Sequence, residues 1–152
     1  MPNLNHMGNH KCLKKHKFNE KDLVNWGLLV EKNGRIYDKF RKRLMFPIMD
    51  HQGDVVGFSG RLMDPEDLGP KYLNSPETAV YKKSRILFGL FQAKDAIRKA
   101  GSAVIVEGNI DILSSHKAGV ANIVAPLGTA LTLDQLKLIK RYGDTVYFAL
   151  DT

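Results

Sequence analysis

The chain shows one pattern of apolar and polar positions before residue 90 and another after it. After residue 90, segments with helical apolar spacing alternate with the apolar runs AVIV, NIVA and TVYFALD. This alternation predicts a βαβαβ order with right-handed crossovers, which gives a parallel sheet with helices packed on it. We therefore expect an α/β fold for residues 90–152.

Glycines and one short motif predict where the helices of this C-terminal part begin and end. Gly101 closes the first predicted helix and Gly119 closes the second. The third helix begins at a T-x-x-Q capping box formed by Thr132 and Gln135. Its apolar residues are expected to face the core: Leu133, Leu136 and Ile139.

The N-terminal part predicts a mixture of helix and strand, an α+β subdomain over residues 18–89. It follows residues 1–17, which are rich in Asn, His and Lys and are expected to form a flexible leader. A short helix is predicted after Asn19, which can cap it, and Gly27 ends it.

Two strands and a loop are predicted after this helix. Residues 35–49 are expected to form one extended stretch, in which Pro47 indicates an edge or irregular position. A turn at DHQGD then leads into a second strand, VVGFSG. Residues 63–81 contain several prolines and little periodicity, so we expect a long loop of the kind that often carries function.

The positive charge is concentrated near the N-terminus. Residues 10–43 contain eleven Lys or Arg and four Asp or Glu, whereas residues 44–152 contain twelve of each kind, and the whole chain has a net charge of +7. A basic segment joined to a neutral globular part indicates a polyanionic partner, in the first place a nucleic acid. The alternative is a solvated tail followed by a basic hairpin.

Other classes of protein are disfavoured. No apolar run approaches the roughly 18 residues that a membrane span requires, and the polar N-terminus lacks the apolar stretch of a secretory signal, so we expect a cytoplasmic protein. Cys12 is the only cysteine, which rules out an intramolecular disulfide and a zinc site built on several thiolates.

Three carboxylates are expected at one edge of the predicted parallel sheet. Glu107 and Asp151 end two strands, and Asp111 lies in the first turn of the helix after Glu107. Ligands bind at this edge of open parallel sheets, and a cluster of carboxylates attracts a hard divalent cation such as Mg²⁺. Two simpler interpretations remain: Asp111 can complement the helix dipole, and Glu107 with Gly108 can form a turn.

The segments VIVEGNIDIL, VAPLGTALT and YFALD, at their spacing in this chain, resemble the Toprim domain of primases, topoisomerases and some nucleases. Upstream, YDKFRKRLMFPIMD, GDVVGFSGRL and above all PKYLNSPETAVYKKSRILFGL resemble the RNA polymerase core of the bacterial DnaG-type DNA primases. The resemblance covers residues 18–152 in unbroken order. It implies DNA-templated synthesis of short RNA primers from nucleoside triphosphates, with a replicative helicase and a single-strand-binding protein as partners of the full-length protein.

The resemblance also implies roles for individual residues. Glu107 and Asp151 would bind the metal, Mg²⁺ or alternatively Mn²⁺, with Asp111 as their acidic catalytic neighbour. The family's groove for template and nucleotide would be formed by Arg41, Arg43, Arg61, Lys71, Tyr72, Asn74 and Lys83. The residues themselves suit this role, because Arg and Lys bind phosphates and Tyr can stack on a base. Arg41 and Arg43 are expected to alternate along one strand and so to share a face.

The sequence departs from the family pattern in two places. Asn109 replaces the usual aromatic residue after Glu107 and Gly108, and we expect it to serve as the helix N-cap. The sequence stops at Thr152, before the second aspartate of the family's D-x-D motif, so we expect a primase fragment with an incomplete Toprim domain. The alternatives are a non-catalytic module that binds single-stranded nucleic acid, or another Toprim enzyme such as a nuclease or topoisomerase.

Overall fold

The computed structural model describes residues 13, 15–64, 66, 68–128 and 130–150. Most of the predicted leader, residues 1–17, therefore lies outside the described residues, and so does Asp151. The chain divides into two compact units, one made of Met1–Phe46 and Gly57–Thr78 and the other of Pro47–Val56 and Ala79–Thr152. The predicted domain boundary at residue 90 stays a prediction.

The first unit begins with a capped helix and a β-hairpin. Helix α2 (Glu20–Asn25) starts at Asn19, whose Oδ1 accepts a hydrogen bond from Lys21 N at 2.9 Å. Strands β1 (Leu29–Lys32) and β2 (Arg35–Asp38) pair antiparallel across Asn33 and Gly34, which both have positive φ. Two positive φ angles give the tight turn whose twist matches a hairpin.

This hairpin corrects one sequence prediction. Residues 35–49 do not form one extended stretch, because β2 ends at Asp38 and four turn residues separate it from the next strand. Lys42, the last of these turn residues, has a φ of 54°. Residues with positive φ cannot continue a strand, so the chain changes direction here.

A second antiparallel sheet has the order β3-β4-β5, formed by β3 (Arg43–Met49), β4 (Val55–Leu62) and β5 (Tyr72–Asn74). Its hairpin β3–β4 contributes residues to both units. The prediction of an edge position for Pro47 is confirmed, because β3 is an outer strand and Pro cannot donate to a ladder. The predicted loop over residues 63–81 is interrupted by β5, which pairs with β4.

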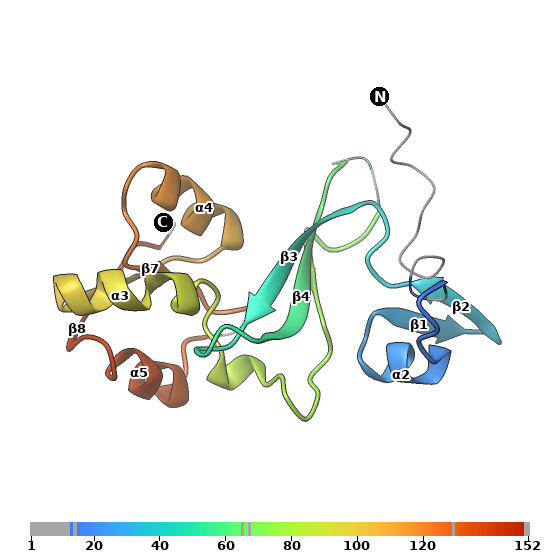
Figure 1. Cartoon of the computed structure of the whole chain (residues 1–152). Coiled ribbons are helices and arrows are strands. Elements are labelled where there is room, and N and C mark those ends of the chain that lie inside the picture. Colours follow the sequence, from blue (N-terminus) through green and yellow to red (C-terminus); the bar gives the residue numbers. More distant parts are fainter. Residues whose placement is uncertain (1–12, 14, 65, 67, 129, 151–152) are drawn as a thin grey trace. The chain divides into compact units, whose positions relative to one another are not determined.

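The second unit, where Figure 1 labels β7 and β8, contains the predicted parallel sheet, whose strand order is β7-β6-β8. Its strands are β6 (Ser102–Ile105), β7 (Ile123–Val124) and β8 (Thr145–Phe148). Helices alternate with them: α3 (Leu90–Ala100), α4 (Asn109–Lys117) and α5 (Leu133–Ile139). The predicted βαβαβ order is therefore confirmed.

The two faces of this sheet are covered by different helices. Ala103 and Ile105 of β6 belong to a buried cluster with residues of α3 and α5, including Ile97 and Ile139. Val104, which points to the opposite face, packs with the cluster that contains Ile112 of α4. Because side chains alternate along a strand, one short strand supplies both cores. Strand β6 is therefore held in place from two sides.

Helix α5 begins at its predicted capping box, but it ends at Ile139, before Gly143, and does not have its predicted orientation. Both bonds of the Thr132 and Gln135 capping box form. Ile139 is fully buried, as predicted, whereas Leu133 is 74% exposed. The prediction that Leu133 faces the core is wrong, because it lies in the first turn of a helix of only seven residues. In the described part of the chain, no helix has the length and apolar character to cross a membrane.

Candidate functional site

The candidate acidic site lies where the central strand of the parallel sheet ends. Val106 N donates to Val124 O at 3.0 Å, which extends the pairing one residue beyond β6, and Glu107 follows directly. Val106 is buried and Glu107 is exposed. The chain therefore leaves the core between these two residues, at the edge of the sheet where ligands bind in open α/β folds.

Asp111 stabilises the start of α4. Its Oδ2 accepts a hydrogen bond from Gly108 N at 2.9 Å, which is the acidic half of a capping box. The side chain is exposed. The helix-dipole interpretation of Asp111 therefore has a direct contact in its favour, and its catalytic role stays a prediction.

Asn109 does not cap α4. Gly108 is the N-cap residue, and Asn109 is the first residue of the helix, with 4% of its surface exposed. The prediction of Asn109 as N-cap is therefore wrong. Its Nδ2 is buried and has no hydrogen-bond partner among the described residues. A buried donor of this kind costs about 1–3 kcal/mol unless something accepts from it.

The carboxylate oxygens at this edge are the type of ligand atom that a divalent cation prefers. Glu107 and Asp111 are exposed carboxylates, and oxygen donors are those that hard divalent cations prefer. Among the described residues, no group of three or more His, Cys, Asp or Glu gathers. Asp151, the second predicted ligand, lies outside them, so its position relative to Glu107 stays a prediction.

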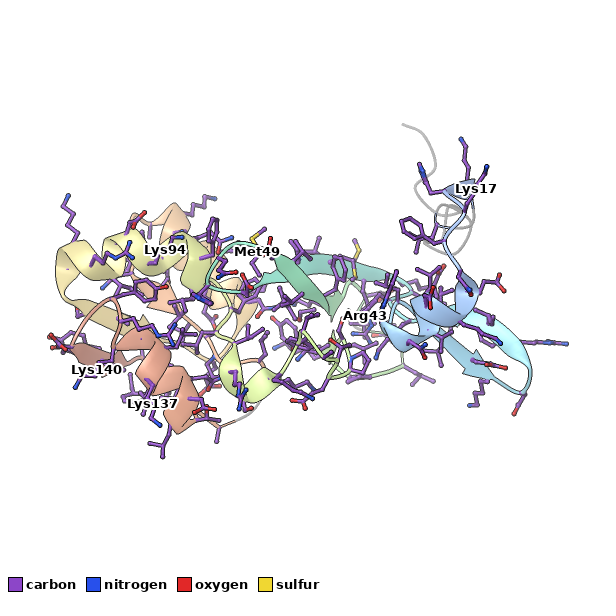
Figure 2. All side chains as sticks on the ribbon, turned by 60° about the horizontal axis from the view of Figure 1, so that its bottom comes forward. Lys17, Arg43, Met49, Lys94, Lys137 and Lys140 are labelled. Carbon is purple, nitrogen blue, oxygen red and sulfur yellow. The ribbon has the colours of Figure 1, made fainter. Side chains whose placement is uncertain are left out.

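The predicted basic residues Arg41 and Arg43 do not share a strand. Arg43 opens β3, while Arg41 lies in the preceding turn, so the predicted common ridge is wrong. The Arg41 guanidinium lies 5.6 Å from the centroid of the Tyr37 ring and remains exposed. Arg43, which Figure 2 labels, donates through Nη1 to the carbonyl oxygens of Gly60 and Pro70, each at 2.9 Å. Arg43 therefore holds together three segments of the first unit.

Strands β4 and β5 bring four predicted residues together. Tyr72 is paired with Arg61, and Asn74 is paired with Ser59, in an antiparallel register. Paired residues lie on the same face of a sheet, as do residues two apart in one strand, so Arg61, Tyr72 and Asn74 share a face. Leu62 N donates to Lys71 O at 2.9 Å, which places Lys71 directly beside the end of β4.

An open pocket of about 590 Å³ adjoins this strand pair. Two predicted residues, Arg61 and Lys71, line it. The sequence interpretation missed the other lining residues, which are Leu44, Leu62, Met63, Asp64 and Gly69. No local motif marks them, because the pocket exists only where β5 returns to β4. The Tyr-Leu-Asn run between two prolines was the one signal for that short strand.

Lys83 belongs to the second unit, together with Glu107. It is half-buried in the 3₁₀ helix η1 (Lys83–Arg85). The remaining predicted basic-groove residues belong to the first unit. The structure thus brings together Arg61, Lys71, Tyr72 and Asn74 in the first unit. The acidic edge with Glu107 belongs to the second unit.

Comparisons with known proteins agree with this architecture. The family model described as the N-terminal domain of the DNA primase catalytic core matches residues 3–94, and the Toprim domain model matches residues 101–152. The DNA primase of Clostridium acetobutylicum is 48% identical over 140 residues, which are 91% of this chain and 23% of that protein. This chain therefore spans about a fifth to a quarter of the length of the curated relatives that it matches.

Two solved structures have the same fold. The zinc-binding and RNA polymerase domains of Aquifex aeolicus primase superpose with a TM-score of 0.85 at 40% identity, covering 93% of this chain and 35% of that one. A DnaG primase catalytic domain bound to ssDNA gives a TM-score of 0.81 at 39% identity, covering 90% of this chain and 44% of that one.

Proposed function

The chain belongs to the DNA primase catalytic core family, and on this premise we propose that it forms part of an enzyme that makes short RNA primers. The template is single-stranded DNA and the substrates are nucleoside triphosphates. The observation that carries the proposal is the exposed Glu107 at the carboxyl end of β6, in a chain that both family models match. A relative's catalytic domain was solved with ssDNA, which supports the same partner here.

In this proposal, Glu107 and Asp151 hold a divalent cation, Mg²⁺ or alternatively Mn²⁺, and Asp111 assists them. When bound, the cation neutralises the negative charge that develops on the phosphates during nucleotidyl transfer. The chain's own contribution is to keep Glu107 exposed beside a buried strand end, with Asp111 fixed by its bond to Gly108 N.

The first unit supplies the proposed groove for template and nucleotide. Arg61 and Lys71 line a pocket large enough for a nucleotide and bind phosphates there, and Tyr72 stacks on a base. Arg41 and Asn74 complete the residues proposed for this unit, and Lys83, a residue of the second unit, is proposed to bind a phosphate of the template or nucleotide. We propose the predicted domains, residues 18–89 and 90–152, as the functional division. The full-length protein would act in the cytoplasm with a replicative helicase and a single-strand-binding protein.

A chimera tests this proposal. The segment of the C. acetobutylicum primase that matches this chain is replaced by the chain itself, and primer synthesis on single-stranded DNA is measured with Mg²⁺ or Mn²⁺. We expect the chimera to make primers, and Glu107→Gln to slow it by about a hundredfold or more, because an electrostatic contact to the reacting phosphates is lost.

Glu31→Gln is the matched control, because Glu31 is an exposed residue of β1 outside the proposed site. It should leave the rate unchanged. Equal rates for Glu107→Gln and its parent would refute the metal role of Glu107. An inactive chimera that still binds single-stranded DNA with strong salt dependence would favour the non-catalytic binding module instead.

A further inference from the structure

The side chain of Gln135 does more than cap α5. Its Oε1 accepts from Thr132 N at 3.0 Å, as a capping box requires. Its Nε2 donates to two carbonyl oxygens about fifty residues away in the chain, Lys83 O at 2.9 Å and Ile86 O at 2.8 Å. Gln135 is fully buried. One amide therefore joins the start of α5 to both ends of η1.

Two neighbours of Gln135 strengthen the same connection. Thr132 Oγ1 donates to Ser84 O at 2.6 Å, so a second carbonyl within η1 is also bonded to the start of α5. Arg85 Nε lies 3.2 Å from Asp134 Oδ2, but both side chains are at least half exposed, so this ion pair contributes little. The buried bonds of Gln135 and the bond of Thr132 therefore fix η1 against α5.

Helix α5 is in turn fixed to the parallel sheet. Ile139, one turn after Gln135, is fully buried in the cluster that contains Ala103 and Ile105 of β6. Strand β6 leads directly to Glu107. A continuous set of contacts within the second unit thus runs from η1 through α5 to the strand that carries the acidic edge.

We propose that Gln135 is a positioning residue for Lys83, which η1 carries. The inference rests on the proposed function, in which Lys83 binds a phosphate of the nucleotide or the template. The Nε2 donations of Gln135 set the position of the η1 backbone, and the Lys83 side chain takes its place from that backbone. Without them the Lys83 ammonium group loses its fixed position.

The capping box alone does not explain the choice of glutamine. Glutamate completes a capping box equally well, because only a carbonyl-type acceptor is needed at that position. Glutamate cannot donate to Lys83 O and Ile86 O, however, and its charge would repel both carbonyl oxygens. Gln135→Glu therefore keeps the cap and removes the two donations.

The experiment measures binding by the purified chain to two probes, a labelled single-stranded DNA oligonucleotide and GTP with Mg²⁺. The probe whose affinity Lys83→Ala lowers is then used with Gln135→Glu. We expect Gln135→Glu to lower the affinity for the same probe, and the double variant to bind it no more weakly than Lys83→Ala does. For DNA, Lys83→Ala should reduce the slope of log affinity against log salt by about 0.7, the value for one phosphate contact on a single strand.

Hydrogen exchange of the η1 amides gives a second measurement. Arg85 N, which donates to Lys82 O at 3.0 Å, should exchange faster in Gln135→Glu, while the amides of β6 should keep their protection. Ile97→Val is the control, because Ile97 is buried in the same unit and is not part of the η1 contacts. It should lower the melting temperature and leave both the affinity and the exchange of η1 unchanged.

The outcomes separate the inference from the proposed function. If Lys83→Ala weakens a probe and folded Gln135→Glu does not, the positioning role is refuted while the role of Lys83 stands. If Lys83→Ala weakens neither probe, the proposed role of Lys83 is wrong and the inference falls with it. If Gln135→Glu does not fold, Thr132→Val is used instead, because it removes only the bonds of the Thr132 hydroxyl. It must then lower the affinity for the same probe and speed the exchange of Arg85 N, each by a smaller amount.

Discussion

At the scale of single residues, polar side chains form hydrogen bonds with backbone groups, both in their own turn and in other segments. Asp50 Oδ1 accepts from the backbone N of Gln52, Gly53 and Asp54 at 2.8 to 3.1 Å and so shapes the turn between β3 and β4. Ser75 Oγ accepts from Phe58 N at 2.9 Å. Arg43 is a further example, since its guanidinium donates hydrogen bonds to the carbonyl oxygens of Gly60 and Pro70.

Replacement of Arg43 by lysine tests this structural role. Lysine cannot reach both carbonyl oxygens with the same rigid group, so Arg43→Lys should lower the free energy of unfolding by about 1–3 kcal/mol. Urea titration followed by fluorescence of Trp26, the only tryptophan, measures the change in the first unit.

Arg41→Lys is the matched control for this comparison. Arg41 is exposed in the turn before β3, and exposed substitutions usually change stability by no more than about 0.5 kcal/mol. Equal effects of the two substitutions would show that the bonds of Arg43 to Gly60 and Pro70 contribute nothing measurable.

At the scale of elements, caps and turns decide where each helix and strand begins. The predicted caps of α2 and α5 form as the sequence motifs indicate. The N-cap of helix α4 is Gly108 instead of the predicted Asn109, and Asp111 is its capping acid. The orientation of a short helix depends on packing, and this is where the prediction for Leu133 failed.

The corrected orientation of α5 predicts unequal effects of two apolar substitutions. Ile139→Ala should lower the free energy of unfolding by about 2–5 kcal/mol, because it opens a cavity in a fully buried cluster. Leu133→Ala should change it by no more than about 0.5 kcal/mol, because Leu133 is 74% exposed. Urea titration followed by circular dichroism measures both, and comparable losses would mean that α5 also packs through Leu133.

At the scale of the whole molecule, the proposed site residues come from two compact units. Glu107, Asp111 and Lys83 belong to the unit with the parallel sheet. The same unit contains the half-buried Lys94 on α3, the exposed Lys137 on α5 and the exposed Lys140 directly after α5 (Figure 2). The pocket residues Arg61 and Lys71 belong to the other unit. In the proposed function, the positive charge concentrated in residues 10–43 adds a broad electrostatic attraction for the nucleic acid to these local contacts.

This charge distribution predicts how binding responds to salt. The affinity of the chain for single-stranded DNA should fall steeply with salt concentration, and Lys71→Ala should reduce the slope of log affinity against log salt by about 0.7. Fluorescence anisotropy at several salt concentrations measures the slope. Lys117→Ala is the control, because Lys117 ends α4 outside the pocket and should leave the slope unchanged. Equal slopes for all three proteins would argue against a phosphate contact of Lys71.

The sequence by itself determined the elements whose signals are local. Alternating apolar runs define β6, β7 and β8, glycines close α3 and α4, and the Thr132 and Gln135 motif starts α5. These signals succeed because hydrogen bonding and side-chain periodicity act within a few residues of each other. Glu107 could be predicted as a candidate site residue for the same reason, since a strand followed by an acidic residue and a glycine is a local pattern.

The tertiary structure alone decided which distant segments meet. Strand β5 forms only because β4 pairs with it. The β1–β2 hairpin is different, because the Asn33–Gly34 turn that forms it is a local signal. Arg43 had the residue type of a phosphate ligand, but contacts with Gly60 and Pro70 gave it a structural role. Gln135 had the position of a cap, but packing of α5 against η1 gave its amide two further partners. A side chain's type and spacing fix what it can bond to, and only the fold determines which of those partners lies within reach.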